Sequence, residues 1–445
     1  MAKDIGTQLV EFAVNTKYED IPQETLQFTK LLVLKTVSGM LAGADKPSGQ
    51  KLAGIIRDRK YPEECVVIGS GFKTSLWEAS LLNAYYAHAS ELEDDRVYAG
   101  DGIGWDITVI PNLFPLAERL MLSGRALVEA MAVGLEVHIR TCLSNSEHLK
   151  QYLIPGAVGP AVGAAKALGL GLKETAGAFG LALSGVPLSH INLWTDAHFF
   201  ESALQSLQGI MAAEMAKVGL FGNPDIDQHL SNFLGKEKVF RERMVEGLGK
   251  RWMVREIMIK KYPVCTHQHR QIDLVIGLMK KHKLSYEDVG GVEVHASPAD
   301  TLCDNPDPKD ENELKFSFQH NLAVAMLDGD VGLERITKEA VNDPKLKEAR
   351  NKVKFILHPE LSNILAKEPG RVVIKTKDGK EFSGERRYPI GHPEEPLTLE
   401  KFRELYFKFT RNKLTEKNIS KSADLIMNLE KVDNIEELTD ILLCA

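Results

Sequence analysis

The sequence predicts a mainly α-helical fold: a large helical domain built from both chain ends, with an inserted α+β lid domain. Apolar residues recur at helical spacing through roughly the first 260 residues, and strand-like alternation begins after about residue 285. Helical spacing returns near "PLTLEKFRELYFKF". A chain of 445 residues is also longer than one hydrophobic core usually supports. We therefore expect the helical domain at 1–262 and 398–445, and the lid domain at 263–397.

The predicted helices follow from apolar periodicity and from glycines near their ends. The segment "PQETLQFTKLLVLKTVSGMLAG" is expected to form a helix that ends at Gly43. The segments "RALVEAMAVGLEVHIRTCL" and "QSLQGIMAAEMAKVGLFG" repeat this pattern. Two others, "AVGPAVGAAKALGL" and "ETAGAFGLALSG", are rich in alanine and glycine. We expect these two to be buried helices that approach their neighbours closely.

The predicted strands lie in the second half of the chain. The segments "GGVEVHAS" and "NKVKFILHP" alternate apolar and polar residues, as half-buried strands do. The segment "RVVIKTKDGKEFSGERR" predicts a hairpin with Asp378-Gly379 at its turn. Helices are predicted between these strands, at "FSFQHNLAVAMLDGD" and "TKEAVNDPKLKEAR".

Composition and charge narrow the class of protein. A hydrophobic content of 44% and a charged content of 26% are typical of a folded soluble protein. The formal net charge of −7 gives no basic field, so a nucleic-acid partner is not expected. The five cysteines are scattered, which indicates free thiols in a reducing compartment. The N-terminus lacks the apolar core of a signal peptide, and no run is long and unbroken enough for a membrane span. We expect a cytoplasmic enzyme.

Four carboxylates crowd beside a histidine in "HASELEDDR", from His88 to Arg96, where a buried helix is expected to end. Neighbouring carboxylates repel one another, so one of them can acquire a raised pKa and carry a proton. The alternative is a solvated helix end, which is the commoner role of such charge runs.

The segment "KKYPVCTHQHR" admits three interpretations. A metal site is disfavoured, because His267 and His269 are not at the spacing of helical zinc ligands and no second cysteine or histidine pair follows. Cys265 as a nucleophile would need a base and an oxyanion donor that the sequence does not reveal. The third interpretation is a cationic pocket for carboxylates, formed by Lys260, Lys261, His269 and Arg270 with Tyr262 as a further donor. A positively charged surface loop is its structural alternative.

The segment "VIGSGFKTS" lacks the spacing of a phosphate-binding loop. A turn that leads into the next helix is the better interpretation.

Several segments together resemble the MmgE/PrpD family, whose activities include 2-methylcitrate dehydration, cis-aconitate decarboxylation and iminodisuccinate epimerisation. The segments occur in the family's order and span nearly the whole chain: "VIGSGFKTSLWEASLLNAYYAHASELEDD", "VIPNLFPLAERLMLSGRAL", "VGLEVHIR", "IKKYPVCTHQHRQID", "ELKFSFQHNLAVAMLDGDV" and "PIGHPEEPLT". The resemblance implies a large helical domain with an α+β lid, a homodimer, and no metal or organic cofactor.

The resemblance also implies site residues. Asp94 falls on the family's active-site aspartate, in a segment where His88 is in pattern, and Lys260 falls on the lysine of the family's K-x-Y-P-x-C segment. Tyr262, Cys265 and His269 are likewise in pattern.

Other positions depart from the family pattern. His198 stands where a second family lysine is expected, and His320 stands where a tyrosine is expected. Gly104-Trp105 occupies the place of a His-Pro pair, and His148 and Lys150 are alternatives for another family histidine. An ordinary methylcitrate dehydratase is therefore not expected.

We expect a cofactor-independent lyase, a dehydratase or decarboxylase, that acts on a small di- or tricarboxylate through an enediolate-type carbanion. Lys260 would neutralise a substrate carboxylate and exchange a proton, and Asp94 would accept a proton or orient a histidine. His198 and His320 would act as donors in place of the family's lysine and tyrosine. Two alternatives stay open: an epimerase or isomerase using the same carbanion, and a paralogue that only binds a carboxylate.

Overall fold

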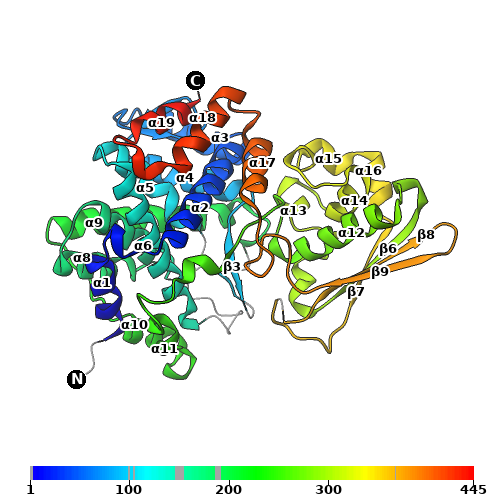
Figure 1. Ribbon diagram of the computed structural model, residues 1–445, viewed down its shortest axis with the longest axis horizontal. Helices are drawn as coiled ribbons and strands as arrows, with labels where there is room; N and C mark the ends of the chain where they lie inside the picture. Colours follow the sequence, from blue (N-terminus) through cyan, green and yellow to red (C-terminus); the bar gives the residue numbers. More distant parts are fainter. Residues whose placement is uncertain are drawn as a thin grey trace. The chain divides into compact units, whose positions relative to one another are not determined.

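The computed structural model describes residues 4–98, 101–103, 106–145, 155–185, 192–365 and 367–444 (Figure 1). The predicted mainly α-helical class is confirmed, with the main β-sheet in the second half of the chain. The chain divides into two compact units. Unit 1 comprises Met1–Arg96, Ile103–Ile257 and Thr398–Ala445, and unit 2 comprises Val97–Gly102 and Met258–Leu397. The domain limits expected at 262/263 and 397/398 stay a prediction.

Unit 1 is built from helices, with a short hairpin of β1 (Cys65–Val67) and β2 (Phe72–Thr74). The helices are α1 (Ile5–Asn15), α2 (Gln23–Gly43), α3 (Pro47–Asp58), α4 (Leu76–Ala89), α5 (Ile110–Arg119), α6 (Gly124–Cys142), α7 (Val158–Ala167), α8 (Leu172–Ala182), α9 (Asp196–Lys217), α10 (Ile226–Leu234), α11 (Arg241–Val245), α17 (Leu399–Thr410), α18 (Glu416–Met427) and α19 (Glu436–Leu443). Three short strands lie where the chain passes between the units: β3 (Asp95–Tyr98), β4 (Asp101–Ile103) and β5 (Ile257–Met258).

Both chain ends contribute to the core of unit 1. Helices α17 and α18 pack against α2, and α19 packs against β1 (Figure 1). The buried Lys30 ammonium on α2 donates to the Met427 carbonyl and to Glu430, each at 2.8 Å. The expectation of one helical body made from both ends of the chain therefore holds for unit 1.

Local sequence signals set several helix limits. Helix α2 ends at Gly43, as predicted, and α6 matches its predicted segment to within a residue. Helix α9 begins earlier than its apolar segment indicated, at Asp196. The "VIGSGFKTS" segment contains the end of β1, a turn with Gly69 and Gly71 at positive φ, and strand β2, and α4 begins directly after it.

The alanine- and glycine-rich helices approach their neighbours closely, as predicted. A Cβ atom added to Gly159 of α7 would lie 2.2 Å from the Cβ of His138 on α6. A Cβ on Gly134 of α6 would lie 3.0 Å from the Cα of Gly163. The small residues therefore let α6 and α7 pack backbone against backbone.

Unit 2 carries a four-stranded sheet in the order β7-β6-β8-β9, from β6 (Val289–Ala296), β7 (Val353–Leu357), β8 (Gly370–Thr376) and β9 (Glu381–Arg386). Strands β6 and β7 are parallel, with Val294 opposite Phe355, and the other pairs are antiparallel. The predicted hairpin is β8–β9, and Gly379 adopts a φ of +84° at its turn. The helices of this unit are α12 (His269–His282), α13 (Glu311–Leu314), α14 (Phe318–Asp328), α15 (Lys338–Asn342) and α16 (Pro344–Arg350).

Helices α12 and α14 pack against this sheet, α12 on β8 and β9 and α14 on β7 (Figure 1). Among the described residues, no helix combines the length and the apolar character needed to cross a membrane.

Candidate functional site

The first group of candidate residues in unit 1 lies at the end of helix α4 and in the turn that follows it. Most of its residues from Leu76 to Ala89 are buried, so the helix runs through the core. It ends where Glu91 adopts a left-handed conformation with φ +57°, which costs a residue other than glycine about 1–2 kcal/mol. This turn is followed at once by Glu93 and Asp94, and all three carboxylates are at least nine-tenths buried. The predicted carboxylate cluster exists, and it is not a solvated helix end.

His88 is held in a defined orientation by helix α9. Its Nδ1 atom lies 2.8 Å from the Ser202 Oγ atom, and this hydroxyl donates its one hydrogen to the Phe199 carbonyl at 3.0 Å. These contacts hold the imidazole ring against α9. The other ring nitrogen of His88, Nε2, lies 4.0 Å from a Glu93 carboxylate oxygen.

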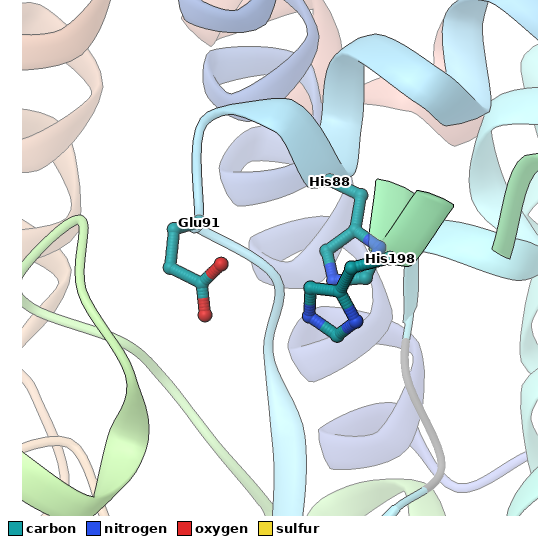
Figure 2. A group of neighbouring side chains, drawn as sticks. All are labelled: His88, Glu91 and His198. Atoms are coloured by element: carbon teal, nitrogen blue, oxygen red, sulfur yellow. The ribbon is translucent and has the colours of Figure 1, made fainter. Parts of the chain in front are cut away.

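His198 enters the same group from the first turn of α9. Its ring centroid lies 4.3 Å from that of His88. One ligand atom from each of His88, Glu91 and His198 can be chosen so that all three lie within 4.8 Å of one another. Figure 2 shows the Glu91 carboxylate extending toward the two imidazole rings. We call these three residues the His-Glu-His cluster.

Asp94 is positioned by a second buried aspartate. The Asp106 carboxylate accepts a hydrogen bond from the Asp94 backbone N–H at 2.9 Å, and the Asp106 N–H donates to the Asp94 carbonyl at 3.3 Å. The other Asp106 oxygen lies within hydrogen-bond distance of the Thr36 hydroxyl on α2. Thr36 also lies 2.9 Å from the Leu32 carbonyl. The loop that carries Asp94 is thus fixed to the core helix α2.

Burial raises the pKa of Asp106 from 3.8 to about 6, against the lowering effect of its hydrogen bonds to Thr36 and Asp94. The Thr36 hydroxyl and the Asp94 N–H both donate to the Asp106 carboxylate, and these two bonds favour its charged form. Asp106 is therefore a buried carboxyl group with a raised pKa, one hydrogen bond away from the backbone of Asp94.

The candidate residues of unit 2 lie between β5 and the first turn of α12. Lys260 is almost fully buried, at 1% exposure. Lys261 and Tyr262 both donate to one Asp273 oxygen, at 3.1 Å and 2.8 Å, and the other oxygen accepts from the Ile390 N–H. Burial and Asp273 raise the pKa of Tyr262 well above its usual value. The charge of Lys261 is thus neutralised within the unit.

The remaining cations of this segment are paired as well. Arg270 donates to the Glu368 carbonyl at 2.7 Å and to Asp300 at 3.2 Å. The His267 Nδ1 atom lies 3.4 Å from the same Asp300 oxygen. Burial would lower the pKa of His267, but Asp300 outweighs burial and raises it. The His269 Nε2 atom donates to the Val264 carbonyl at 3.1 Å.

Cys265 and His320 are both buried. The Cys265 N–H donates to the Lys315 carbonyl at 3.1 Å, which fixes the backbone of this segment. The His320 Nε2 atom donates to the Arg335 carbonyl at 2.9 Å, so Nδ1 is its basic atom. Burial lowers the pKa of His320 to about 4.

The structure therefore brings His88 and His198 together within unit 1, and Asp94 lies on the loop that follows Glu91. Lys260, Tyr262, Cys265 and their neighbours form a second group within unit 2. Four positions named from the sequence, Gly104, Trp105, His148 and Lys150, lie outside the described residues.

Sequence reasoning missed the residues that orient these groups: Ser202, Asp106, Asp273 and Asp300. Each is a lone serine or aspartate whose partner is distant or on another element. No periodicity in the sequence marks such residues. Only their burial in the folded structure identifies them.

Two family models match the chain and cover most of it. The MmgE/PrpD N-terminal domain matches residues 7–234, and the MmgE/PrpD C-terminal domain matches residues 262–431. The chain belongs to the MmgE/PrpD family.

Its relatives include enzymes named cis-aconitate decarboxylase. The Aspergillus terreus enzyme is 23% identical over 477 residues, which cover 99% of this chain and 96% of that enzyme. The human enzyme is 24% identical over 387 residues, covering 82% of this chain and 79% of the enzyme. The mouse enzyme is 25% identical over 385 residues, covering 82% and 78%.

Proposed function

We propose that the protein is a lyase that acts on a small di- or tricarboxylate, and that decarboxylation is its reaction. The observation that carries this proposal is the match to a cis-aconitate decarboxylase over nearly the full length of both chains. The buried acid group around Asp94 supports it, since proton transfer next to a carboxylate needs an acid or base shielded from water. A homodimer and a cytoplasmic location remain expectations.

The reaction breaks the bond between a carbon and its carboxylate, and the electron pair stays on that carbon. CO2 leaves, and a proton from an acid on the protein completes the product. The intermediate carbanion is stabilised when its charge spreads into an adjacent carboxylate that a cation neutralises. Lys260 is our candidate for this cation, and Asp94 for the group that carries or directs the proton.

His320 is the weaker of the two proposed histidine donors. Its pKa of about 4 means that it is neutral at pH 7, and its Nε2 hydrogen is committed to the Arg335 carbonyl. His320 could therefore accept a proton on Nδ1, but it would not donate one as the family's tyrosine does. His198 is the stronger candidate, because it lies beside His88.

The proposal is tested by proton NMR of the purified protein with cis-aconitate and a panel of other di- and tricarboxylates in heavy water. Loss of CO2 with a new deuterium-labelled product is expected. A dehydratase would instead give a new alkene without CO2 loss. Carbon-bound deuterium without a new compound would indicate an epimerase or isomerase. No change across the panel, together with thermal stabilisation by a carboxylate, would leave a binding protein and refute the lyase.

A further inference from the structure

Cys265 stands at the start of a long helical segment in unit 2. A single 3₁₀ turn at Thr266–Gln268 continues directly into the 14-residue helix α12. The Cys265 carbonyl accepts a hydrogen bond from the Gln268 N–H at 3.1 Å, so Cys265 is the residue that caps this segment. The N-terminal end of a helix carries a partial positive charge, which favours a neighbouring anion such as a cysteine thiolate. The place of Cys265 in the fold therefore favours ionisation of its thiol.

His267 lies in the same turn, and Asp300 influences its charge. The His267 Nδ1 atom lies 3.4 Å from the Oδ1 atom of Asp300, a residue that is 2% exposed. The other Asp300 oxygen accepts from the Ser297 N–H at 3.2 Å and from the Ser297 hydroxyl at 3.1 Å, which fixes the carboxylate. Burial lowers the pKa of His267, but Asp300 and Cys265 outweigh burial and raise it. The fold thus favours the imidazolium form of His267.

The charges of Cys265 and His267 stabilise each other. A negative charge on Cys265 is among the influences that raise the pKa of His267, so the two side chains are close enough for their charges to interact. This interaction is mutual, and the imidazolium therefore stabilises the thiolate to the same extent. Asp300 and Arg270 also act on His267, and they form an ion pair with each other at 3.2 Å. Because the charges of that pair largely offset one another, the imidazolium remains as the charge of this group that acts on Cys265.

A second cysteine beside a histidine provides a contrast within the same chain. The Sγ atom of Cys142 lies 3.9 Å from the Nε2 atom of His138. Burial lowers the pKa of His138 to about 3, so this histidine is neutral at pH 7 and offers no positive charge to the thiol. A neighbouring histidine activates a cysteine only when the histidine is protonated, which is what Asp300 promotes for His267.

The remaining cysteines are in surroundings that disfavour reaction. Burial raises the pKa of Cys65 to about 12 and also raises the pKa of Cys444. Cys303 is fully buried, whereas Cys265 retains 8% exposure. Cys265 is therefore expected to react first with a small reagent at neutral pH.

We propose that Cys265 and His267 form a thiolate–imidazolium pair positioned by Asp300, and that the Cys265 thiolate is a site of oxidation by hydrogen peroxide. The three residues have the order of nucleophile, base and orienting carboxylate. The thiolate sulfur forms a bond to one peroxide oxygen while the O–O bond breaks. The sulfur is oxidised to a sulfenic acid, and the other oxygen leaves as hydroxide, which takes the imidazolium proton and becomes water. This site is independent of the proposed lyase reaction.

The first test measures the ionisation of Cys265 by alkylation. The folded, full-length protein is treated with iodoacetamide at pH 6 and pH 8, and mass spectrometry of its peptides gives the rate at each cysteine. Only the thiolate reacts, so a thiol with the ordinary pKa of about 8.5 slows about 75-fold from pH 8 to pH 6. We expect Cys265 to slow less than about 5-fold. Cys444 is the internal control and should slow about 75- to 100-fold, because its pKa is raised.

The matched variants are His267→Asn and His282→Asn. His267→Asn removes the imidazolium, so the rate at Cys265 should acquire the roughly 75-fold pH dependence of an ordinary thiol. His282 lies at the other end of the same helix, where it stacks on Phe382, and its replacement should leave the rates at Cys265 unchanged. Circular dichroism and the thermal midpoint establish that each variant is folded. If His267→Asn does not fold, the pH dependence of the parent protein still decides whether Cys265 is ionised.

The second test follows oxidation with dimedone, which traps sulfenic acids. Hydrogen peroxide should give a dimedone adduct at Cys265 in the parent protein, and at least about 10-fold less of it at pH 6 in His267→Asn. The proposal is overturned if Cys265 shows the same pH dependence as Cys444, or if His267→Asn leaves that of Cys265 unaltered. It is also overturned if peroxide produces no adduct at Cys265. Turnover of carboxylates does not enter either test, so these results and those for the lyase are judged separately.

Discussion

The two groups of candidate residues differ in how their charged side chains are paired. In unit 1, the turn after α4 gathers three buried carboxylates beside two histidines. In unit 2, the segment before α12 pairs its cations with its own acids, Lys261 with Asp273 and Arg270 with Asp300. Internal pairing stabilises a fold, whereas a concentration of one sign of charge is costly unless a proton or cation offsets it. The comparison shows that Lys261 and Arg270 are neutralised within unit 2, whereas the acids of the unit 1 group are gathered beside two histidines.

The strongest test of this comparison is to replace Asp94 and Lys260, the two residues that the family resemblance assigns to the site. Asp94→Asn and Lys260→Ala should each lower turnover of the carboxylate substrate by about 10²–10⁴-fold, because each removes a group that carries or stabilises charge in the reaction. The measurement is the rate of product formation by NMR. The control is Asp58→Asn, at an exposed end of α3, which should keep full activity.

Full activity in Lys260→Ala would remove Lys260 from the mechanism. The thermal midpoint of both variants should stay near that of the parent, so that loss of activity reflects chemistry rather than unfolding.

Asp273→Ala tests the scaffold half of the comparison. It deprives the Tyr262 hydroxyl, the Lys261 ammonium and the Ile390 N–H of their shared acceptor, so we expect a loss of about 3 kcal/mol in the free energy of unfolding. Urea denaturation measures it. A variant as stable as the parent would show that this pairing is not structural.

His320→Gln probes the response of unit 2 to acid. The pKa of His320 is lowered from 6.5 to about 4, so its neutral form is stabilised by the fold. Its contribution is present above pH 6.5 and declines as the pH falls toward 4, by about 2 kcal/mol between pH 7 and pH 5. Glutamine can still donate to the Arg335 carbonyl but does not titrate. Stability curves at the two pH values should therefore converge for the variant.

Asp106→Asn tests a pH dependence of stability whose sign is opposite to that from His320. The raised pKa of Asp106 means that its contribution is complete below pH 3.8 and is lost as the pH rises through about 6. Between pH 5 and pH 7 the parent loses about 1 kcal/mol from this group, and the variant does not. An asparagine amide can donate to Thr36, so the fold should persist. An unchanged pH profile of stability would place the Asp106 pKa near its usual value.

The parts of the fold that were predicted correctly depend on neighbours in sequence. The stop of α2 at Gly43 and the turn at Gly379 follow from the conformational freedom of glycine, and the strand β6 from alternation along one segment. The start of α9 was missed because the turn before the apolar stretch gave no clear signal.

In the candidate site, too, the features set by neighbouring residues were predicted and the contacts between distant residues were not. The crowd of acids after His88 was visible in the sequence, because its members are consecutive. The contact between His88 and His198 joins residues from different helices. Both histidines were named from the sequence, but they were assigned separate roles. Likewise, the cations of the 260–270 segment were expected to face a substrate, since nothing in a lone Asp273 or Asp300 marks it as their partner.

The hydrogen bond from the Asp94 N–H to Asp106 makes one backbone amide a reporter of a buried ionisation. Its exchange with solvent deuterium requires the loop to detach from α2, so this amide should rank among the slowest-exchanging ones outside helices and strands. Its nitrogen and proton resonances should also shift as Asp106 gains or loses its proton. A single labelled position would then show whether a bound carboxylate changes the protonation of the core before any bond in that carboxylate is broken.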